Sequence, residues 1–228
     1  MNATFTHQET TVALHSPAAE RNQQPILQAL QRLLPAQGRA LEISSGTGQH
    51  VAFFAAHLPG WQWQPTDAHR QGFGSITAWC TQAGVTNVLA PVPLDVLSAH
   101  WPSEGTPFNG LFDAIFCANM LHISPWATCA ALMQGAANHL APKGYLITYG
   151  PYLESTVLTS TGNLAFDASL RQSNPDWGIR QLDDVVQQAH LAGLQLHQRV
   201  PMPANNLLLV FTPTTTPSPS NELITTPT

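Results

Sequence analysis

Residues 39–50 have the sequence RALEISSGTGQH, and this stretch decides the fold. It joins a short apolar run to a bend of serine and glycine, after which apolar residues recur at helical spacing from Val51. Small residues between a strand and a helix let the backbone pass close to a ligand, and the amides at the helix start can receive a carboxylate or a phosphate. The stretch therefore predicts a ligand-binding bend, or else a tight turn without a ligand. The residues that we expect to hold a ligand here are Glu42, Ser44, Gly46, Thr47 and Gly48.

Strand and helix patterns alternate on both sides of this bend. Apolar or alternating runs predict strands at 39–44, 61–66, 88–94, 111–118 and 145–149, with helical patterns between them. Two further runs, 194–200 and 207–211, are close enough in sequence to pair antiparallel. We therefore expect an α/β fold whose Rossmann-like sheet of seven strands is mostly parallel with an antiparallel last strand, and has helices on both faces.

One domain is expected to span residues 17–212. Residues 1–16 and 213–228 are polar and have little to bury, so we expect them to be disordered tails. Residues 151–178 are too long for a simple connection, and we interpret them as an insertion that forms a substrate lid. The insertion's candidate lid residues are Asn163, Asp167, Arg171 and Trp177, although Asp167 and Arg171 are also spaced for an ordinary helix ion pair.

The composition excludes several classes of function. The formal net charge is -5, with 8 Lys and Arg against 13 Asp and Glu, so we expect no binding to nucleic acid. We expect no membrane association, because no apolar stretch approaches the length that spans a bilayer. The three cysteines lack CxxC spacing and the histidines are scattered, so no metal is expected. Without a signal peptide pattern the expected location is cytoplasmic, and the oligomeric state stays open.

Three carboxylates lie at the ends of successive expected strands. Asp67 follows the second strand, where an acid can accept both hydroxyls of a ribose. Asp95 follows the third, where a carboxylate can accept from an adenine amino group. Taken singly, each Asp is better explained as a turn or cap residue than as a ligand contact. Together with Glu42 they predict a nucleoside site at the carboxyl edge of the sheet.

Two nucleoside cofactors are compatible with this edge. A dinucleotide-binding fold is marked by the pattern G-x-G-x-x-G. Here Gly46 and Gly48 match its first two glycines, but Val51 stands where the third glycine would be. The pattern E-x-S-x-G-x-G instead resembles motif I of Rossmann-like methyltransferases, with Ser44 in the place of the first glycine. We expect Ser44 to be tolerated there if its φ is negative.

Longer blocks sharpen this resemblance to one family. FDASLR (166–171), NPDWGIR (174–180) and MPANN (202–206) are long and unusual, and with the bend they resemble the DUF938 group of methyltransferase-like proteins. The resemblance covers residues 18–212. It implies the methyltransferase fold and S-adenosylmethionine as cofactor, and it names no methyl acceptor.

Several other residues are candidates for the site. Asn119, after the fourth strand, is assigned to the cofactor. His122 is the candidate base, or a hydrogen-bonded histidine that orders the next helix. Tyr149, at the end of the fifth strand, lines the methyl path or simply packs. Arg21 reaches the methionine carboxylate of the cofactor, or forms a salt bridge at the sheet edge.

The function expected from these residues is methyl transfer from S-adenosylmethionine to a small-molecule acceptor. The alternatives are a catalytically inactive methyltransferase-like protein that binds or scaffolds, and an NAD-dependent oxidoreductase. Binding of the two cofactors separates these hypotheses.

Overall fold

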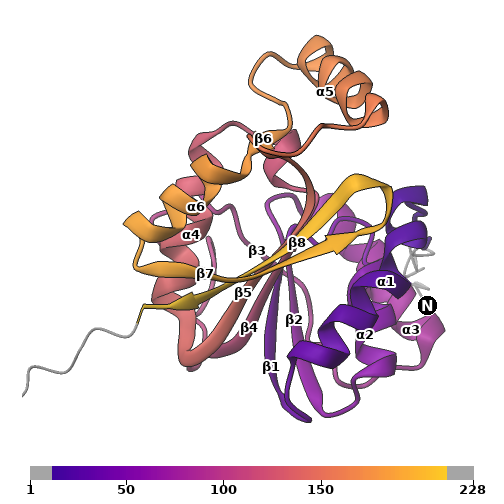
Figure 1. The fold of residues 1–228 in the computed structure, drawn as a ribbon. Coiled ribbons are helices and arrows are strands. Elements are labelled where there is room, and N and C mark those ends of the chain that lie inside the picture. The colour runs from indigo at the N-terminus through magenta and orange to yellow at the C-terminus, as the bar shows by residue number, and fades with distance from the viewer. Residues whose placement is uncertain (1–11, 215–228) are drawn as a thin grey trace, which may run out of the picture.

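The computed structural model describes residues 12–214. The helices and longer strands follow the alternation expected from the sequence (Figure 1). The helices are α1 (Pro17–Leu33), α2 (Gln49–His57), α3 (Phe73–Ala83), α4 (Ala127–His139), α5 (Thr161–Ser173) and α6 (Leu182–Leu191). The strands are β1 (Gly38–Ile43), β2 (Trp61–Asp67), β3 (Val92–Pro93), β4 (Phe112–Ala118), β5 (Leu140–Leu153), β6 (Arg180–Gln181), β7 (Leu194–Met202) and β8 (Asn206–Pro213).

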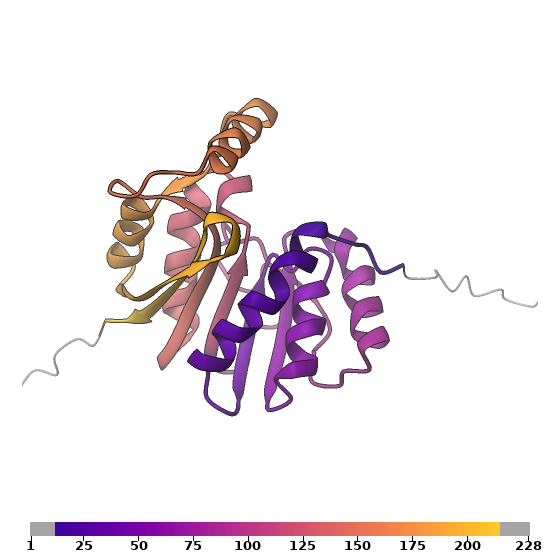
Figure 2. The same cartoon turned by 45° about the vertical axis from the view of Figure 1, so that its right-hand side comes forward.

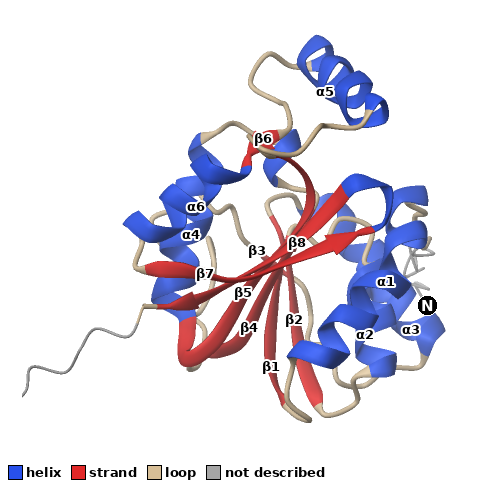
Figure 3. Ribbon diagram, in the orientation of Figure 1, coloured by secondary structure: helices blue, strands red, loops and turns tan. Residues whose placement is uncertain are grey.

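The strands form one sheet in the order β3-β2-β1-β4-β5-β8-β7, and the short β6 pairs with β5 off this path (Figure 3). The pairs from β3 to β5 are parallel. The last strand, β8, is antiparallel to both of its neighbours, β5 and β7. The expected α/β sheet, mostly parallel with an antiparallel last strand, is confirmed.

The sheet separates two hydrophobic cores because successive residues of a strand face opposite sides. In β1, Ala40 faces a core made with α1, α2 and α3, whereas Leu41 faces a core made with α4 and α6. Figure 2 shows these two groups of helices on the two faces of the sheet. Glu42 lies on the same side as Ala40, beneath the helices that flank the bend.

The third strand is shorter than the sequence indicates. We expected it over 88–94, but pairing with β2 is limited to Val92–Pro93 and an isolated bridge between Val88 and Trp63. Pro91 and Pro93 have no N–H to donate, so a continuous ladder cannot form there. The carbonyl of Ala90 instead accepts from the side chain of Gln64 at 2.9 Å.

The insertion at 151–178 carries a helix of its own. β5 continues through its first residues to Leu153, and α5 follows after a loop. α5 stands beyond the carboxyl ends of the parallel strands, at the top of Figure 1. Ligands of parallel sheets bind beyond these strand ends, so α5 is positioned to cover a site.

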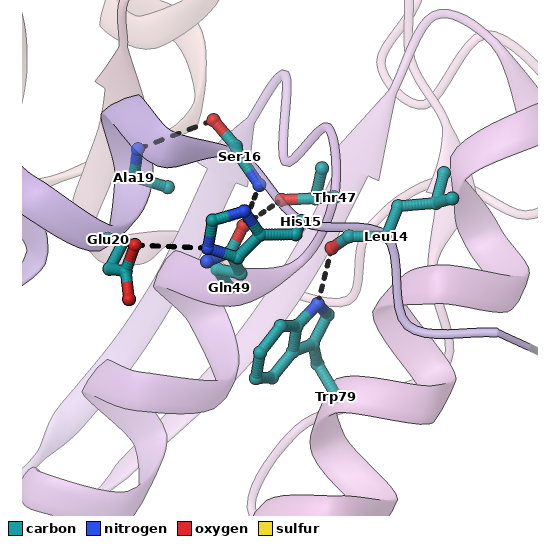
Figure 4. A network of polar contacts seen from close by, with 8 residues as sticks. All are labelled: Leu14, His15, Ser16, Ala19, Glu20, Thr47, Gln49 and Trp79. Carbon is teal, nitrogen blue, oxygen red and sulfur yellow. Dashed lines mark hydrogen bonds and ion pairs between the residues drawn. The ribbon is translucent and has the colours of Figure 1, made fainter.

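The N-terminal segment that precedes α1 is hydrogen-bonded to the helices around the bend (Figure 4). The Leu14 N–H donates to Ser75 Oγ at 2.8 Å, and the Leu14 carbonyl accepts from the Trp79 indole at 2.7 Å. The Ser16 N–H donates to the side chain of Gln49, in the first turn of α2. Residues 12–16, which we expected to be part of a loose tail, therefore lie against α2 and α3. Residues 213 and 214, expected to begin the C-terminal tail, belong to the fold, since Pro213 ends β8 and the Thr214 N–H donates to the Gly193 carbonyl at 2.8 Å. The remainder of the two expected tails, 1–11 and 215–228, lies outside the described residues.

Within residues 12–214, no helix combines the length and the apolar character that crossing a membrane requires.

Candidate functional site

The bend after β1 has three residues in the left-handed region. Their φ angles are 57° at Ser44, 54° at Gly46 and 87° at Gly48. The condition on which Ser44 was expected to be tolerated is therefore not met, because its φ is positive. A residue with a Cβ pays roughly 1–2 kcal/mol for this conformation, so the bend holds Ser44 under strain.

Asp67 links the bend to the end of β2. Its Oδ2 accepts from the Gly46 N–H at 3.0 Å, and its Oδ1 accepts from the His69 N–H at 3.0 Å. Each carboxylate oxygen has a second lone pair, so the side chain keeps acceptor capacity for a ligand. The Asp67 carboxylate therefore holds the bend in place and can still accept a hydrogen bond from a ligand bound next to the bend.

A cavity of about 410 Å³ opens at this point. Its lining includes Ser44, Asp67, Asp95 and Met120, and we call it the acidic cavity. Asp95 accepts from the Leu97 N–H at 2.9 Å through Oδ1, and no hydrogen bond from residues 12–214 reaches its Oδ2. The structure thus brings both strand-end aspartates and the bend into one cavity. Such a cavity offers acceptors to hydroxyl and amino donors.

Glu42 lies beneath the bend and is 2% exposed. Burial raises the pKa of its carboxyl from 4.5 to about 8; a hydrogen bond with Ser45 opposes the rise and the nearby charge of Asp67 adds to it. Its Oε2 is buried without a hydrogen-bond partner among residues 12–214. A buried polar atom without a partner is unfavourable, and a ligand with a polar group at the bend would satisfy it.

A second cavity, of about 780 Å³, lies on the other side of the segment that follows β4. It is lined by Arg21, Asn22, Asn119, His122, Tyr149 and Phe166, among others, and we call it the Arg21 cavity. Ile123 lines both cavities. Consecutive residues divide between them, since Asn119 faces the Arg21 cavity and Met120 the acidic cavity. The two cavities therefore meet at residues 119–123.

Asn119 is held at this junction by the backbone. Its φ is 61°, and its N–H donates to the Tyr149 carbonyl at 2.8 Å. Asparagine adopts this left-handed conformation more readily than most residues. The turn directs the chain after β4 from one cavity to the other.

His122 is 6% exposed and lies against the edge of Phe166, with ring centroids 5.5 Å apart. Burial, helped by the charge of Arg180, lowers its pKa from 6.5 to about 4, so the ring is neutral at pH 7. Within residues 12–214 no hydrogen bond is formed by the ring; the backbone carbonyl accepts from Gly178 at 3.0 Å. A Cβ on Gly150 would lie 3.3 Å from the ring Nδ1, so glycine leaves room for the imidazole.

Tyr149 is 4% exposed and belongs to a chain of polar groups. Burial raises the pKa of its hydroxyl, and a hydrogen bond with Asn22 and the charge of Arg21 oppose the rise. The Oδ1 of Asn22 in turn accepts from His50 Nε2 at 2.6 Å. Neither Asn22 nor His50 was expected from the sequence to be a site residue. The available signal was a polar residue on the buried face of α1, between Ala19 and Ile26.

Arg21 lies apart from the two aspartates, in the lining of the larger cavity. Among the described residues it forms no ion pair, so the alternative of a salt bridge at the sheet edge is not seen. Its charge acts on the Tyr149 hydroxyl.

The insertion contributes to both cavities. Asn163 lines the Arg21 cavity and donates to the Asn205 carbonyl at 2.9 Å, while Trp177 lines the acidic cavity. Asp167 and Arg171 line neither cavity and form an ion pair at 2.8 Å. Asp167 also accepts from the Ile179 N–H at 2.7 Å. This pair fastens α5 to the NPDWGIR segment.

In the part of the chain that the structure describes, no three His, Cys, Asp or Glu side chains are grouped as metal ligands would be.

Comparison with known proteins adds family and fold. The model of the family described as "Protein of unknown function (DUF938)" matches residues 13–213. Among solved structures, the chain is similar to CalO1, a methyltransferase in calicheamicin biosynthesis solved in its SAH-bound form, at 14% identity and a TM-score of 0.71. It is also similar to the mitomycin 7-O-methyltransferase MmcR (14%, 0.71) and to an O-methyltransferase family 2 protein from Planctomyces limnophilus in complex with apigenin (18%, 0.69).

Each of these three matches covers 86% of this chain, but 54%, 55% and 59% of the respective neighbour. The chain therefore spans little more than half the length of the structures that it resembles. At these identities the likeness establishes a methyltransferase-like fold.

Proposed function

The chain belongs to the DUF938 family, and from that premise we propose that it is an S-adenosylmethionine-dependent methyltransferase acting on a small-molecule acceptor. The cofactor occupies the acidic cavity and the bend above Glu42, and the acceptor occupies the Arg21 cavity. One observation carries the proposal: the Asp67 carboxylate binds the Gly46 amide and lines the same cavity as Ser44 and Asp95.

The residues of this cavity fit the cofactor by their chemistry. Asp67 accepts from ribose hydroxyls, and Asp95 accepts from the adenine amino group. Beneath the bend, Glu42 has a buried oxygen without a partner. A cationic amino group bound near the bend would favour the ionised form of this carboxyl and lower its pKa from about 8. The remaining proposed cofactor contacts are Ser44, Gly46, Thr47 and Gly48, together with Asn119, which lines the Arg21 cavity at the point where the two cavities meet.

The acceptor is proposed to bind where the two cavities meet. A volume of about 780 Å³ is within the range of small-molecule sites. When bound, S-adenosylmethionine supplies an electrophilic methyl group, and the chain's contribution is to hold the acceptor in line with it. The His122 ring is the proposed acceptor of any proton that leaves the methyl acceptor; it is neutral at pH 7, and its pKa of about 4 makes it a weak base. Tyr149 is proposed to orient the methyl acceptor through its hydroxyl.

The location proposed for this enzyme is the cytoplasm. Cys80, Cys117 and Cys129 are all free thiols, as a reducing compartment keeps them.

Isothermal titration with S-adenosylmethionine and S-adenosylhomocysteine tests the cofactor site. We expect the wild-type protein to bind both, and Asp67→Ala to bind at least about tenfold more weakly, because hydrogen bonds to a charged group contribute about 1.5–3 kcal/mol. Asp184→Ala, an exposed aspartate on α6, is the matched control and is expected to bind as the wild type does.

Other outcomes separate the alternatives. No heat at millimolar cofactor contradicts the proposal, and heat with NAD instead supports an oxidoreductase. Binding without methyl transfer to any of a wide panel of acceptors supports an inactive binding protein. If the Asp67→Ala variant unfolds at the same urea concentration as the wild type and binds the cofactor with unchanged affinity, the cofactor site does not include Asp67 and the proposed location is wrong.

A further inference from the structure

The Arg21 cavity differs from the acidic cavity in the sign of its charge. Arg21 is the one charged side chain among the described residues that line it, and no Asp or Glu is among them. The acidic cavity has the opposite character, with Asp67 and Asp95 and no Lys or Arg in its described lining. This separation is notable in a chain whose formal net charge is -5.

Other groups around the Arg21 cavity leave its positive charge uncompensated. His122 is neutral, because burial and Arg180 lower its pKa to about 4. The Arg180 guanidinium donates to the backbone carbonyls of Leu121 and Asp176, at 2.9 and 2.8 Å, rather than to a carboxylate. The charges of Asp167 and Asp176 also act on Arg180, but neither residue lines the Arg21 cavity, and the His122 ring still experiences the positive charge of Arg180.

The walls of the cavity are suited to a planar group. The rings of His122 and Phe166 meet edge to face at an interplanar angle of 70°, and Tyr149 lies in the same lining. Asn163, held by Asn205, adds an amide to the same lining. Aromatic walls with a few polar groups favour ring-containing ligands.

We infer that the methyl acceptor is a planar aromatic oxyanion whose anionic group binds Arg21 and whose ring lies against Phe166, Tyr149 and His122. This inference rests on the proposed function and adds the substrate class. A guanidinium matches a carboxylate or a phosphate in bidentate geometry. The carboxylates of the acidic cavity repel the same anion, so the acceptor enters with its charged end toward Arg21 and away from Asp67 and Asp95.

Ligand-observed NMR with small probes tests this class. Benzoate and benzamide have the same size and differ in charge, and phenyl phosphate distinguishes phosphate from carboxylate recognition. With the wild-type protein saturated with S-adenosylhomocysteine, we expect benzoate or phenyl phosphate to bind at least about fivefold more tightly than benzamide, which corresponds to about 1 kcal/mol. Equal affinities for all three probes, or no binding of any, overturns the inference.

Two arginines of α1 provide the matched variants. Arg21→Gln is expected to remove the preference for the anionic probes, and Arg21→Lys to retain part of it. Arg32→Gln, in the last turn of the same helix and outside the cavity, is expected to keep the full preference. Both residues are exposed, so the substitutions leave the core intact.

Titration of the same variants with S-adenosylhomocysteine separates the two proposals. If Arg21→Gln weakens S-adenosylhomocysteine about tenfold and leaves the probe preference unchanged, Arg21 serves the cofactor carboxylate and the inference is overturned. If the wild-type protein binds no S-adenosylhomocysteine but discriminates benzoate from benzamide through Arg21, the anion site stands and the methyltransferase proposal falls.

Discussion

At the scale of single residues, Ser44 is the place where the bend is under strain. Its φ of 57° is one that glycine adopts freely. We expect Ser44→Gly to raise the free energy of unfolding by about 0.5–1 kcal/mol, since relief of roughly 1–2 kcal/mol of strain exceeds the entropy cost of a glycine. Urea unfolding measures this change.

Ser45→Gly is the neighbouring control, and it is expected to destabilise. Ser45 Oγ accepts from the Thr66 N–H at 3.2 Å and hydrogen-bonds with Glu42, and both contacts would be lost. If Ser44→Gly destabilises as much as Ser45→Gly, the Ser44 side chain makes a contact that outweighs its strain.

Glu42 makes stability depend on pH. Its pKa is about 8 in the folded protein and 4.5 as an ordinary carboxyl, so between these values the folded state holds a proton that the unfolded state releases. The stability of the wild-type protein, relative to Glu42→Gln, therefore falls as pH rises through this window, by about 1.4 kcal/mol per pH unit. Urea unfolding of both proteins from pH 5 to pH 8.5 measures the difference, and parallel pH curves would contradict it.

The sequence identified some of these residues and not others. Asp67 was predictable because a strand-end carboxylate needs only the strand and the bend to be located, and both are local patterns. The contact between Asn22 and His50 was not, because it depends on how α1 docks against α2, across 28 residues of chain. The strain at Ser44 could not be predicted either, since the sequence does not determine the sign of φ at this serine and only the folded bend shows that it is positive.

At the scale of elements, the glycine at the start of α2 sets how closely that helix approaches α3. A Cβ on Gly48 would lie 2.5 Å from the Ile76 Cα, whereas a Cβ on Gly46 would have no neighbour nearer than 4.0 Å. Both glycines have positive φ, so Gly46→Ala isolates the conformational strain. We expect Gly46→Ala to cost roughly 1–2 kcal/mol.

Gly48→Ala carries the same strain and adds a clash with the backbone of α3. Overpacking adds roughly 1–3 kcal/mol, so we expect this variant to be the less stable of the two in thermal and urea unfolding. Equal losses for the two variants would mean that α3 moves away from α2 without a penalty.

Elements with strong local patterns were predictable, and the exceptions have identifiable causes. The third strand was predicted too long because the prediction relied on the apolar character of residues 88–94. It did not allow for Pro91 and Pro93, which cannot donate hydrogen bonds to a neighbouring strand. α5 was indicated only by the helical spacing of Asp167 and Arg171, because residues 161–173 have an apolar pattern too weak for a buried face and only Asn163 and Leu170 are buried there. A helix that is mostly exposed lacks the periodicity that marks a core helix.

At the scale of the whole molecule, charge limits the partners. With 8 Lys and Arg against 13 Asp and Glu, the chain has few cations with which to displace the counterions of a nucleic acid. We expect no binding of a fluorescently labelled 20-base-pair duplex or single strand at micromolar protein in low salt, as measured by anisotropy. Binding that weakens steeply with added salt would contradict this expectation.

The position of β8 has a consequence for how the chain is made. This strand comes last among the strands of residues 12–214, yet it lies between β5 and β7 and pairs with both. During synthesis from the N-terminus, β7 leaves the ribosome before its partner strand β8, and one edge of β5 also stays unpaired until residues 206–213 follow. A nascent chain arrested before this strand emerges therefore exposes the unpaired edges of β5 and β7, whereas one that carries a C-terminal linker long enough for β8 to leave the ribosome is protected from proteases.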